Sequence, residues 1–148
     1  MIKGHEIVQI ASYHLYIKYR LGAETSRDIH YPAELDCSEF IEHSLRIIGY
    51  IMPDGRAFPD GSWLQYEVCD PKISVDEAMH YAGALVFNRG TGSGKIDHVG
   101  ISTGTGCTIE AVSAKSNLPG SGMVNIFRWR PLWDVAGLIP GVEYERWS

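Results

Sequence analysis

The sequence predicts an α+β fold in which N-terminal helices pack on a C-terminal antiparallel sheet or small barrel. In the first half, apolar residues recur at helical spacing over residues 5–20 and 37–48. From residue 84 onward the pattern changes to short runs rich in β-branched and aromatic residues, separated by glycine-rich turns. With 148 residues, of which 45% are hydrophobic and 21% charged, the chain is expected to form a single domain over residues 1–148.

The two longer predicted helices have recognisable ends. The first is amphipathic, and Gly22 is a natural stop signal after it. The second follows Asp36 and Glu39, which have the spacing of a capping box, and it ends at Gly49. In a capping box the two side chains satisfy the first backbone donors of the helix. This spacing places Cys37 in the first turn of the second helix.

The middle of the chain and the second half complete the prediction. Prolines and Asp-Gly pairs between residues 51 and 61 predict a long surface loop, and short helices are expected at 62–68 and 74–81. The expected strands are residues 85–87, 98–102, 108–112 and 124–129. Because glycine-containing turns separate neighbouring strands, we expect a meander of hairpins behind the helices.

Charge and hydropathy exclude two classes of partner. The chain has 13 Lys and Arg against 18 Asp and Glu, a net charge of -5, and no run of basic residues. No stretch approaches the roughly 18 apolar residues of a membrane-spanning helix, and the first six residues lack the apolar core of a secretory signal. We therefore expect no nucleic-acid partner and no membrane span.

The three cysteines differ in their expected surroundings. Their odd number and the absence of a CxxC pair predict neither a disulfide framework nor a zinc knuckle. Cys37 is predicted at a helix N-terminus, where partial positive charge and open backbone donors favour a thiolate. Cys69 and Cys107 have no such position and are expected to be packing residues. Cys37 is therefore the candidate nucleophile.

A cysteine nucleophile needs an imidazole to accept its proton and usually a third group to orient that imidazole. His98 opens a predicted strand, and the next strand carries Glu110, so a hairpin would bring both side chains to one face. His43 is a rival base, but it lies six positions after Cys37, and such positions do not share a helix face. The expected catalytic set is therefore Cys37, His98 and Glu110.

No metal or cofactor is expected at this site. The sequence has no HExxH pattern, and its six histidines are scattered without evident ligand spacing, which disfavours a zinc amidase. Cysteine acyl transfer needs no cofactor because the thiolate, the imidazole and the backbone donors supply the chemistry.

These residues resemble the NlpC-type cysteine peptidases, which cleave peptides of the bacterial cell wall. Residues 36–40 (DCSEF) look like the family's Asp-Cys-Ser-Gly-Phe nucleophile motif, and residues 98–101 (HVGI) are similar to its His-Val-Gly-Ile strand. Residues 84–87 (ALVF) fit the preceding Asp-Leu-Val-Phe strand, and residues 109–111 (IEA) fall where the family places its third polar residue. The resemblance implies a minimal papain-like domain that cuts an amide bond in a peptidoglycan stem peptide.

The sequence departs from the family pattern at three places. Glu39 replaces the usual Gly after the Cys-Ser pair, and Glu110 stands where His, Asn or Gln is more common. The family's Tyr and Gly-Gly element before the cysteine has no clear counterpart. By resemblance, Tyr31 is the expected substrate-side aromatic residue, with Tyr19 as the alternative, and Ser38 is expected to contact the substrate.

The expected function is a cysteine peptidase or amidase acting on peptidoglycan peptides. A non-catalytic binding module on the same scaffold and an acyltransferase using the same Cys-His pair remain alternatives. The protein is expected to be made in the cytoplasm and to reach the wall through a phage particle, a lysis pathway, a secretion machine or release from a precursor. A delivery apparatus or an immunity partner would fit these routes.

Overall fold

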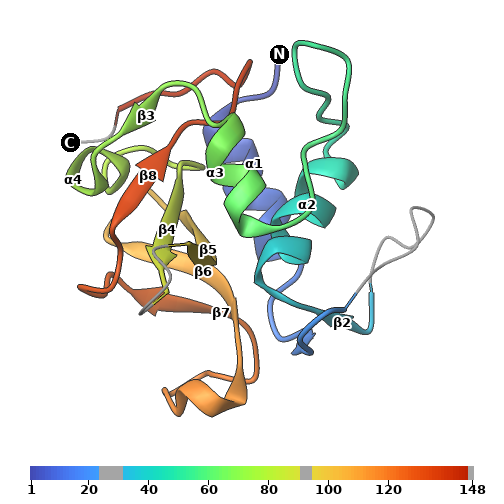
Figure 1. The fold of residues 1–148 in the computed structure, drawn as a ribbon, viewed down its shortest axis with the longest axis vertical. Coiled ribbons are helices and arrows are strands. Elements are labelled where there is room, and N and C mark those ends of the chain that lie inside the picture. The colour runs from blue at the N-terminus through green and yellow to red at the C-terminus, as the bar shows by residue number, and fades with distance from the viewer. Residues whose placement is uncertain (24–31, 91–94, 147–148) are drawn as a thin grey trace.

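The computed structural model describes residues 1–23, 32–90 and 95–146, and Figure 1 shows its mixed α+β architecture. The helices in this part of the chain are α1 (Gly4–Ser12), α2 (Cys37–Ile47), α3 (Ser62–Val68) and α4 (Val75–Ala78), with a 3₁₀ turn, η1 (Ala114–Ser116). The strands are β1 (Lys18–Tyr19), β2 (Glu34–Leu35), β3 (Lys72–Ile73), β4 (Leu85–Arg89), β5 (Ile96–Ser102), β6 (Cys107–Val112), β7 (Met123–Arg128) and β8 (Val135–Gly137).

The described strands form one curled sheet in the order β2-β1-β7-β6-β5-β4-β8-β3. Its centre, from β7 to β4, is the predicted antiparallel meander, in which each strand pairs with the next one in sequence. The terminal strands β2 and β3 do not pair with each other, so the sheet is an open half-barrel. Helices α1, α2 and α3 lie together on one side of it (Figure 1).

The first helix ends earlier than the sequence predicts. We expected helical structure over residues 5–20, but α1 ends at Ser12 and Tyr16 has a positive φ of 75°. Beyond it the chain pairs with β7: Tyr16 N donates to Val124 O at 2.7 Å, and Val124 N donates to Ile17 O at 2.8 Å. Strand pairing with a distant part of the chain therefore overrides the local helical pattern.

The other predicted elements agree with the structure to different degrees. The helices α2 and α3 are confirmed, whereas α4 has four residues and is shorter than the predicted 74–81. The four meander strands are confirmed within about two residues at each end. The short strands β1, β2, β3 and β8 were not predicted, because two or three residues are too few to show a period.

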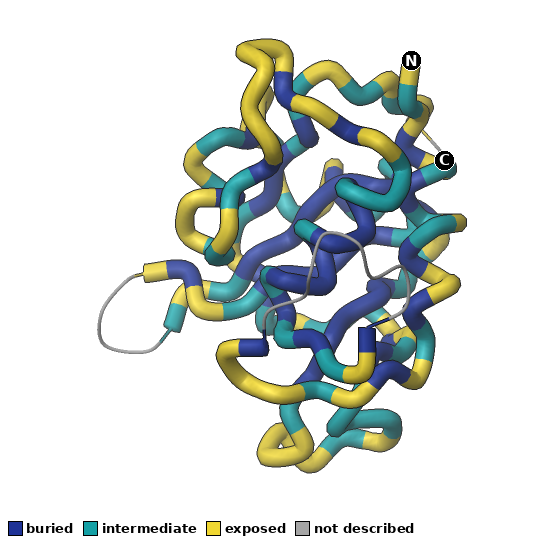
Figure 2. The backbone as a smooth tube through the Cα atoms, turned by 90° about the vertical axis from the view of Figure 1, so that its right-hand side faces the viewer, coloured by how far each residue is buried: buried dark blue, intermediate teal, exposed yellow. Residues whose placement is uncertain are grey.

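Two apolar clusters hold the layers together. The larger cluster joins the helices to the sheet, with Phe40 of α2, Phe87 of β4 and Ile101 of β5 fully buried within it. The smaller cluster, around Val86 and Trp133, packs α4 and the segment after β7 against β4 and β8. Figure 2 shows the buried residues concentrated through the middle of the molecule. The N-terminus of α2 is thereby fixed against β5 by packing.

Within the described ranges, the helices are too short or too polar for any of them to cross a membrane.

Candidate active site

The N-terminus of α2 presents Cys37 to the sheet. Asp36 is the N-cap of this helix, and its Oδ1 accepts a hydrogen bond from Glu39 N at 2.8 Å. Cys37 is the first helical residue, is 9% exposed, and has its Sγ 3.9 Å from the carbonyl oxygen of Asp97 on β5. The thiol therefore lies at a helix start, where backbone donors and the helix dipole favour negative charge.

The β5–β6 hairpin brings His98 and Glu110 together as the sequence predicts. Ile101 pairs with Ile109, which places Gly100 opposite Glu110 and His98 diagonal to it on the same face. His98 Nε2 lies 2.7 Å from Glu110 Oε1. Because an ionised carboxylate only accepts hydrogen bonds, Nε2 is the donor, and Nδ1 is the ring nitrogen left for the thiol.

Glu110 is a completely buried carboxylate with partners on both oxygens. Its Oε2 accepts a hydrogen bond from the hydroxyl of Thr108, and its Oε1 forms an ion pair with Arg130 Nη2 in addition to the bond from His98. Burial alone would raise the pKa of Glu110, but His98, Thr108 and Arg130 together lower it below the usual value. Glu110 is therefore ionised at neutral pH.

The surroundings of His98 favour its protonated form. Burial lowers the pKa of the imidazole, but the interactions with Cys37 and Glu110 outweigh it and raise the pKa to about 9. An imidazolium beside a thiol stabilises the thiolate. The arrangement therefore favours a protonated His98 beside the Cys37 thiol.

Trp133 covers the imidazole of His98. The two rings are stacked, with centroids 5.6 Å apart and planes 14° apart, and Trp133 is only 6% exposed. The guanidinium carbon of Arg130 lies 5.7 Å from the centre of the Trp133 ring. Trp133 therefore packs against one face of the His98 ring and restricts its rotation.

Gly100 provides the space in which Glu110 and Trp133 approach β5. A Cβ atom added to Gly100 would lie 2.7 Å from Glu110 Cγ and 3.1 Å from Cη2 of Trp133. We expect Gly100→Ala to lower the free energy of unfolding by about 1–3 kcal/mol, the usual cost of overpacking, and to slow the alkylation of Cys37. Urea denaturation and the iodoacetamide reaction rate measure these effects. An Ala variant unchanged in both would contradict this packing role.

A cavity of about 330 Å³ lies beside His98, and its lining includes Tyr19, Ser113 and Arg130. Burial and the charges of Cys37 and Asp36 raise the pKa of Tyr19 to about 12. Of the two candidate aromatic residues, the structure thus brings Tyr19 to the site, whereas Tyr31 lies outside the described residues. The hydroxyl of Ser38 donates to Asp36 Oδ1 at 3.3 Å.

The remaining cysteines lie away from this site. Cys69 is 2% exposed, and burial raises its pKa to about 12. Cys107 begins β6, after the turn that joins β5 to β6, and is half-buried.

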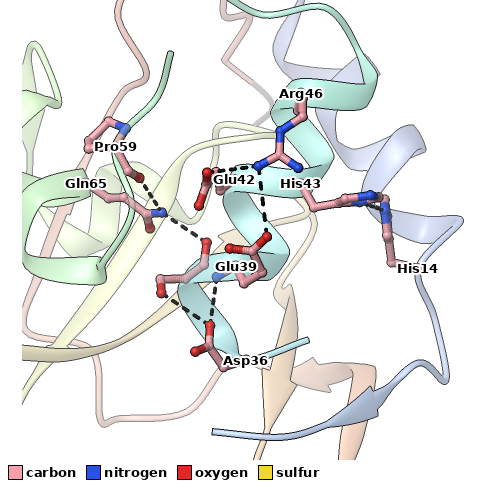
Figure 3. A network of polar contacts seen from close by, with 9 residues as sticks. His14, Asp36, Glu39, Glu42, His43, Arg46, Pro59 and Gln65 are labelled. Atoms are coloured by element: carbon pink, nitrogen blue, oxygen red, sulfur yellow. Dashed lines mark hydrogen bonds and ion pairs between the residues drawn. The ribbon is translucent and has the colours of Figure 1, made fainter. Parts of the chain in front are cut away.

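The rival base His43 lies elsewhere on α2. It is completely buried, and its Nδ1 is 2.8 Å from Nε2 of His14 (Figure 3). Burial and the neighbouring His43 lower the pKa of His14 to about 4, so His14 is neutral. Because Nδ1 of His14 also contacts Ile10 O at 2.9 Å, this pair connects the first helix to α2.

Glu39 is 4% exposed and belongs to an acidic group on α2. Its carboxylate lies 4.0 Å from Arg46, which also pairs with Glu42 at 2.9 Å (Figure 3). Burial, Glu39 and Asp60 raise the pKa of Glu42 to about 7. Among the described residues, Glu39, Glu42 and Asp60 are the one set of three metal-ligating side chains close enough to share an ion. Arg46 already balances part of this charge.

Sequence reasoning missed three residues that surround Glu110: Thr108, Arg130 and Trp133. A buried carboxylate requires a counter-charge and further hydrogen bonds, so the inward-facing position of Glu110 was itself a signal for a nearby cation. Which cation supplies it depends on the path of the chain after β7. That path has no periodic pattern in the sequence.

The family model described as the NlpC/P60 family matches residues 17–126, and no curated protein matches the chain. Among solved structures, the NlpC/p60 domain of the peptidoglycan hydrolase SagA is 25% identical, with a TM-score of 0.69, over 93% of this chain and 100% of that one.

Two mycobacterial structures share the fold at lower identity. The P60 domain of antigen MAP1204 from M. avium subspecies paratuberculosis is 22% identical, with a TM-score of 0.68, over 92% of this chain and 94% of that one. The peptidoglycan hydrolase RipB from Mycobacterium tuberculosis is 22% identical, with a TM-score of 0.65, over 92% of this chain and 65% of that one. The family match covers most of the sequence and agrees with the papain-like arrangement of helices and sheet. The chain belongs to the NlpC/P60 family.

Proposed function

We propose that this protein is a cysteine peptidase or amidase that cleaves an amide bond in peptidoglycan stem peptides. One observation carries the proposal: His98, which bonds Glu110 at 2.7 Å, also interacts with the thiol of Cys37 at the start of α2. Family membership and the peptidoglycan hydrolases among the structural neighbours support the substrate class.

The proposed reaction is acyl transfer through a thioester. His98 holds the proton of Cys37, and the thiolate attacks the amide carbonyl carbon. Backbone donors in the first turn of α2 stabilise the negative charge that develops on the carbonyl oxygen. His98 then donates its proton to the leaving amine, and a water molecule, deprotonated by His98, attacks the thioester and releases the acid.

Each supporting residue has a role in this scheme. Glu110 holds Nε2 of His98, so Nδ1 faces the thiol, and it stabilises the imidazolium formed during attack. Tyr19, in the cavity beside His98, is the proposed substrate-side aromatic contact. Ser38 supports the helix start through its bond to Asp36, and its backbone N–H is a proposed oxyanion donor.

The proposal is tested by mass spectrometry of defined muropeptides with meso-diaminopimelate or lysine stem peptides. We expect the protein to cleave one stem-peptide amide, to lose this activity when iodoacetamide alkylates Cys37, and to keep it in excess EDTA. A metal-dependent amidase would show the opposite pattern. Absence of cleavage by folded protein with a reactive Cys37 would overturn the hydrolase assignment.

A further inference from the structure

Arg130 and His98 share one oxygen of Glu110. The Nη2 atom of Arg130 pairs with Oε1, the same atom that accepts the hydrogen bond from His98 Nε2 at 2.7 Å. The guanidinium also lies over the rings of Phe127 and Trp133, with its central carbon 5.1 Å and 5.7 Å from their centres. Arg130 is thus held by aromatic contacts in a position where its charge acts on the carboxylate that orients His98.

A completely buried carboxylate at this position needs a permanent counter-charge. Leaving a charge buried without a partner is strongly destabilising, and such a group takes up a proton instead. Thr108 supplies a hydrogen bond but no charge. His98 is charged only when protonated, and its charge changes during the proposed reaction. Arginine keeps its charge at every relevant pH, so it supplies the constant partner.

The other ionisable groups near this pair do not replace Arg130. Cys37 approaches from α2 and, as a thiolate, is negative. Asp36 precedes it, Asp97 adjoins His98 on β5, and Tyr19 comes from β1. None of these four groups carries a positive charge, so among the described residues around this pair Arg130 is the permanent cation beside Glu110.

We propose that Arg130 is a positioning residue that keeps Glu110 ionised and aligned, and thereby allows a carboxylate to orient His98. This inference rests on the proposed function, since it concerns the same Cys37–His98 site. It also accounts for a departure from the family pattern, in which a neutral His, Asn or Gln is more common at the position of Glu110. A neutral side chain there would not need Arg130.

This dependence predicts a coupling between Arg130 and Glu110. Removing the cation leaves Glu110 either protonated, and poorly suited to hold the imidazolium, or charged without a partner. Both outcomes make the thiolate of Cys37 less favourable. With Gln at position 110 there is no carboxylate for Arg130 to keep ionised, so the loss of Arg130 is expected to change the reactivity of Cys37 little. The two substitutions are therefore expected to be strongly non-additive.

The experiment is a double-mutant cycle of Arg130→Met and Glu110→Gln. The readout is the rate of Cys37 alkylation by iodoacetamide between pH 5 and 10, measured on the Cys37 peptide so that Cys69 and Cys107 do not contribute. With Glu110 present, Arg130→Met is expected to move the curve to higher pH by about one unit, which is a roughly tenfold slower reaction on the acid side of the curve. In the Glu110→Gln background we expect a shift below about a third of a unit.

The controls separate positioning from stability. Arg128→Met removes an exposed arginine from β7 and is expected to leave the curve unchanged. Arg130→Lys keeps the charge and is expected to move the curve part of the way back toward wild type. If Arg130→Met does not fold, Arg130→Gln, which also removes the charge, replaces it in the cycle. Equal shifts in both backgrounds, or no shift in either, would overturn the role of Arg130. Because alkylation uses no wall peptide, this result is independent of whether the protein cleaves muropeptides.

Discussion

Cys37→Ala is expected to abolish muropeptide cleavage while the protein stays folded. The substitution removes the only atom proposed to form the acyl-enzyme, and loss of the nucleophile from a concerted catalytic set lowers kcat by about 10⁴-fold or more. Cys37 belongs to the larger apolar cluster, but its side chain is small and lies at the start of α2, so truncation to Ala removes only one sulfur atom from the core. The midpoint of urea denaturation should therefore change little.

The same variant also tests the contact between Cys37 and His98. Interactions with the thiol raise the pKa of His98, which reaches about 9 in the intact site. In Cys37→Ala we expect the pKa of His98 to fall, measured by the pH dependence of its imidazole signals in nuclear magnetic resonance spectra. Cys107→Ala, on β6, is the matched control and should retain both cleavage and the high pKa of His98. Cleavage by Cys37→Ala at near-normal rates would disprove the nucleophile assignment.

Local sequence signals were sufficient where they agreed with one another. The second helix was predicted accurately because its apolar period, the N-cap Asp36 and the stop at Gly49 all indicate the same segment. The meander strands were predicted because each is long enough to show a strand pattern between glycine turns. In contrast, the segment around Tyr16 has a helical pattern but forms strand pairs with β7. Its structure depends on contacts that are distant in sequence.

The candidate site, like the fold, contains residues that local sequence signals predict and residues that they do not. The hairpin spacing of His98 and Glu110 places both side chains on one face, and the structure has them in hydrogen-bond contact. Arg130 and Trp133 follow β7 in a segment without regular structure, and their contacts with Glu110 and His98 arise only when the sheet curls. Sequence could therefore predict the residues that are fixed by a hairpin, but not those that are brought in by a loop.

His98→Gln is expected to reduce kcat/KM for muropeptides by about 10³-fold, within the range for loss of a general base. Glutamine can still bond Glu110, but it cannot hold or return the proton of Cys37, so the alkylation curve of Cys37 should move to higher pH. His5→Gln removes an exposed histidine and is the control. An unchanged alkylation-versus-pH curve of Cys37 in His98→Gln would contradict the proposed Cys37–His98 pair.

Stability measured against pH gives an independent test of His98. Its pKa in the folded protein, about 9, lies above the usual value of 6.5, so the folded state binds the proton more tightly than the unfolded chain does. This contribution to stability is fully present below pH 6.5 and is lost as the pH rises through 9. We therefore expect the difference in unfolding free energy between wild type and His98→Gln to shrink over this interval, as measured by urea denaturation at several pH values. If this difference in unfolding free energy stayed constant with pH, His98 would not be protonated in the folded protein. The proposed thiolate–imidazolium pair would then be replaced by a neutral thiol and a neutral imidazole.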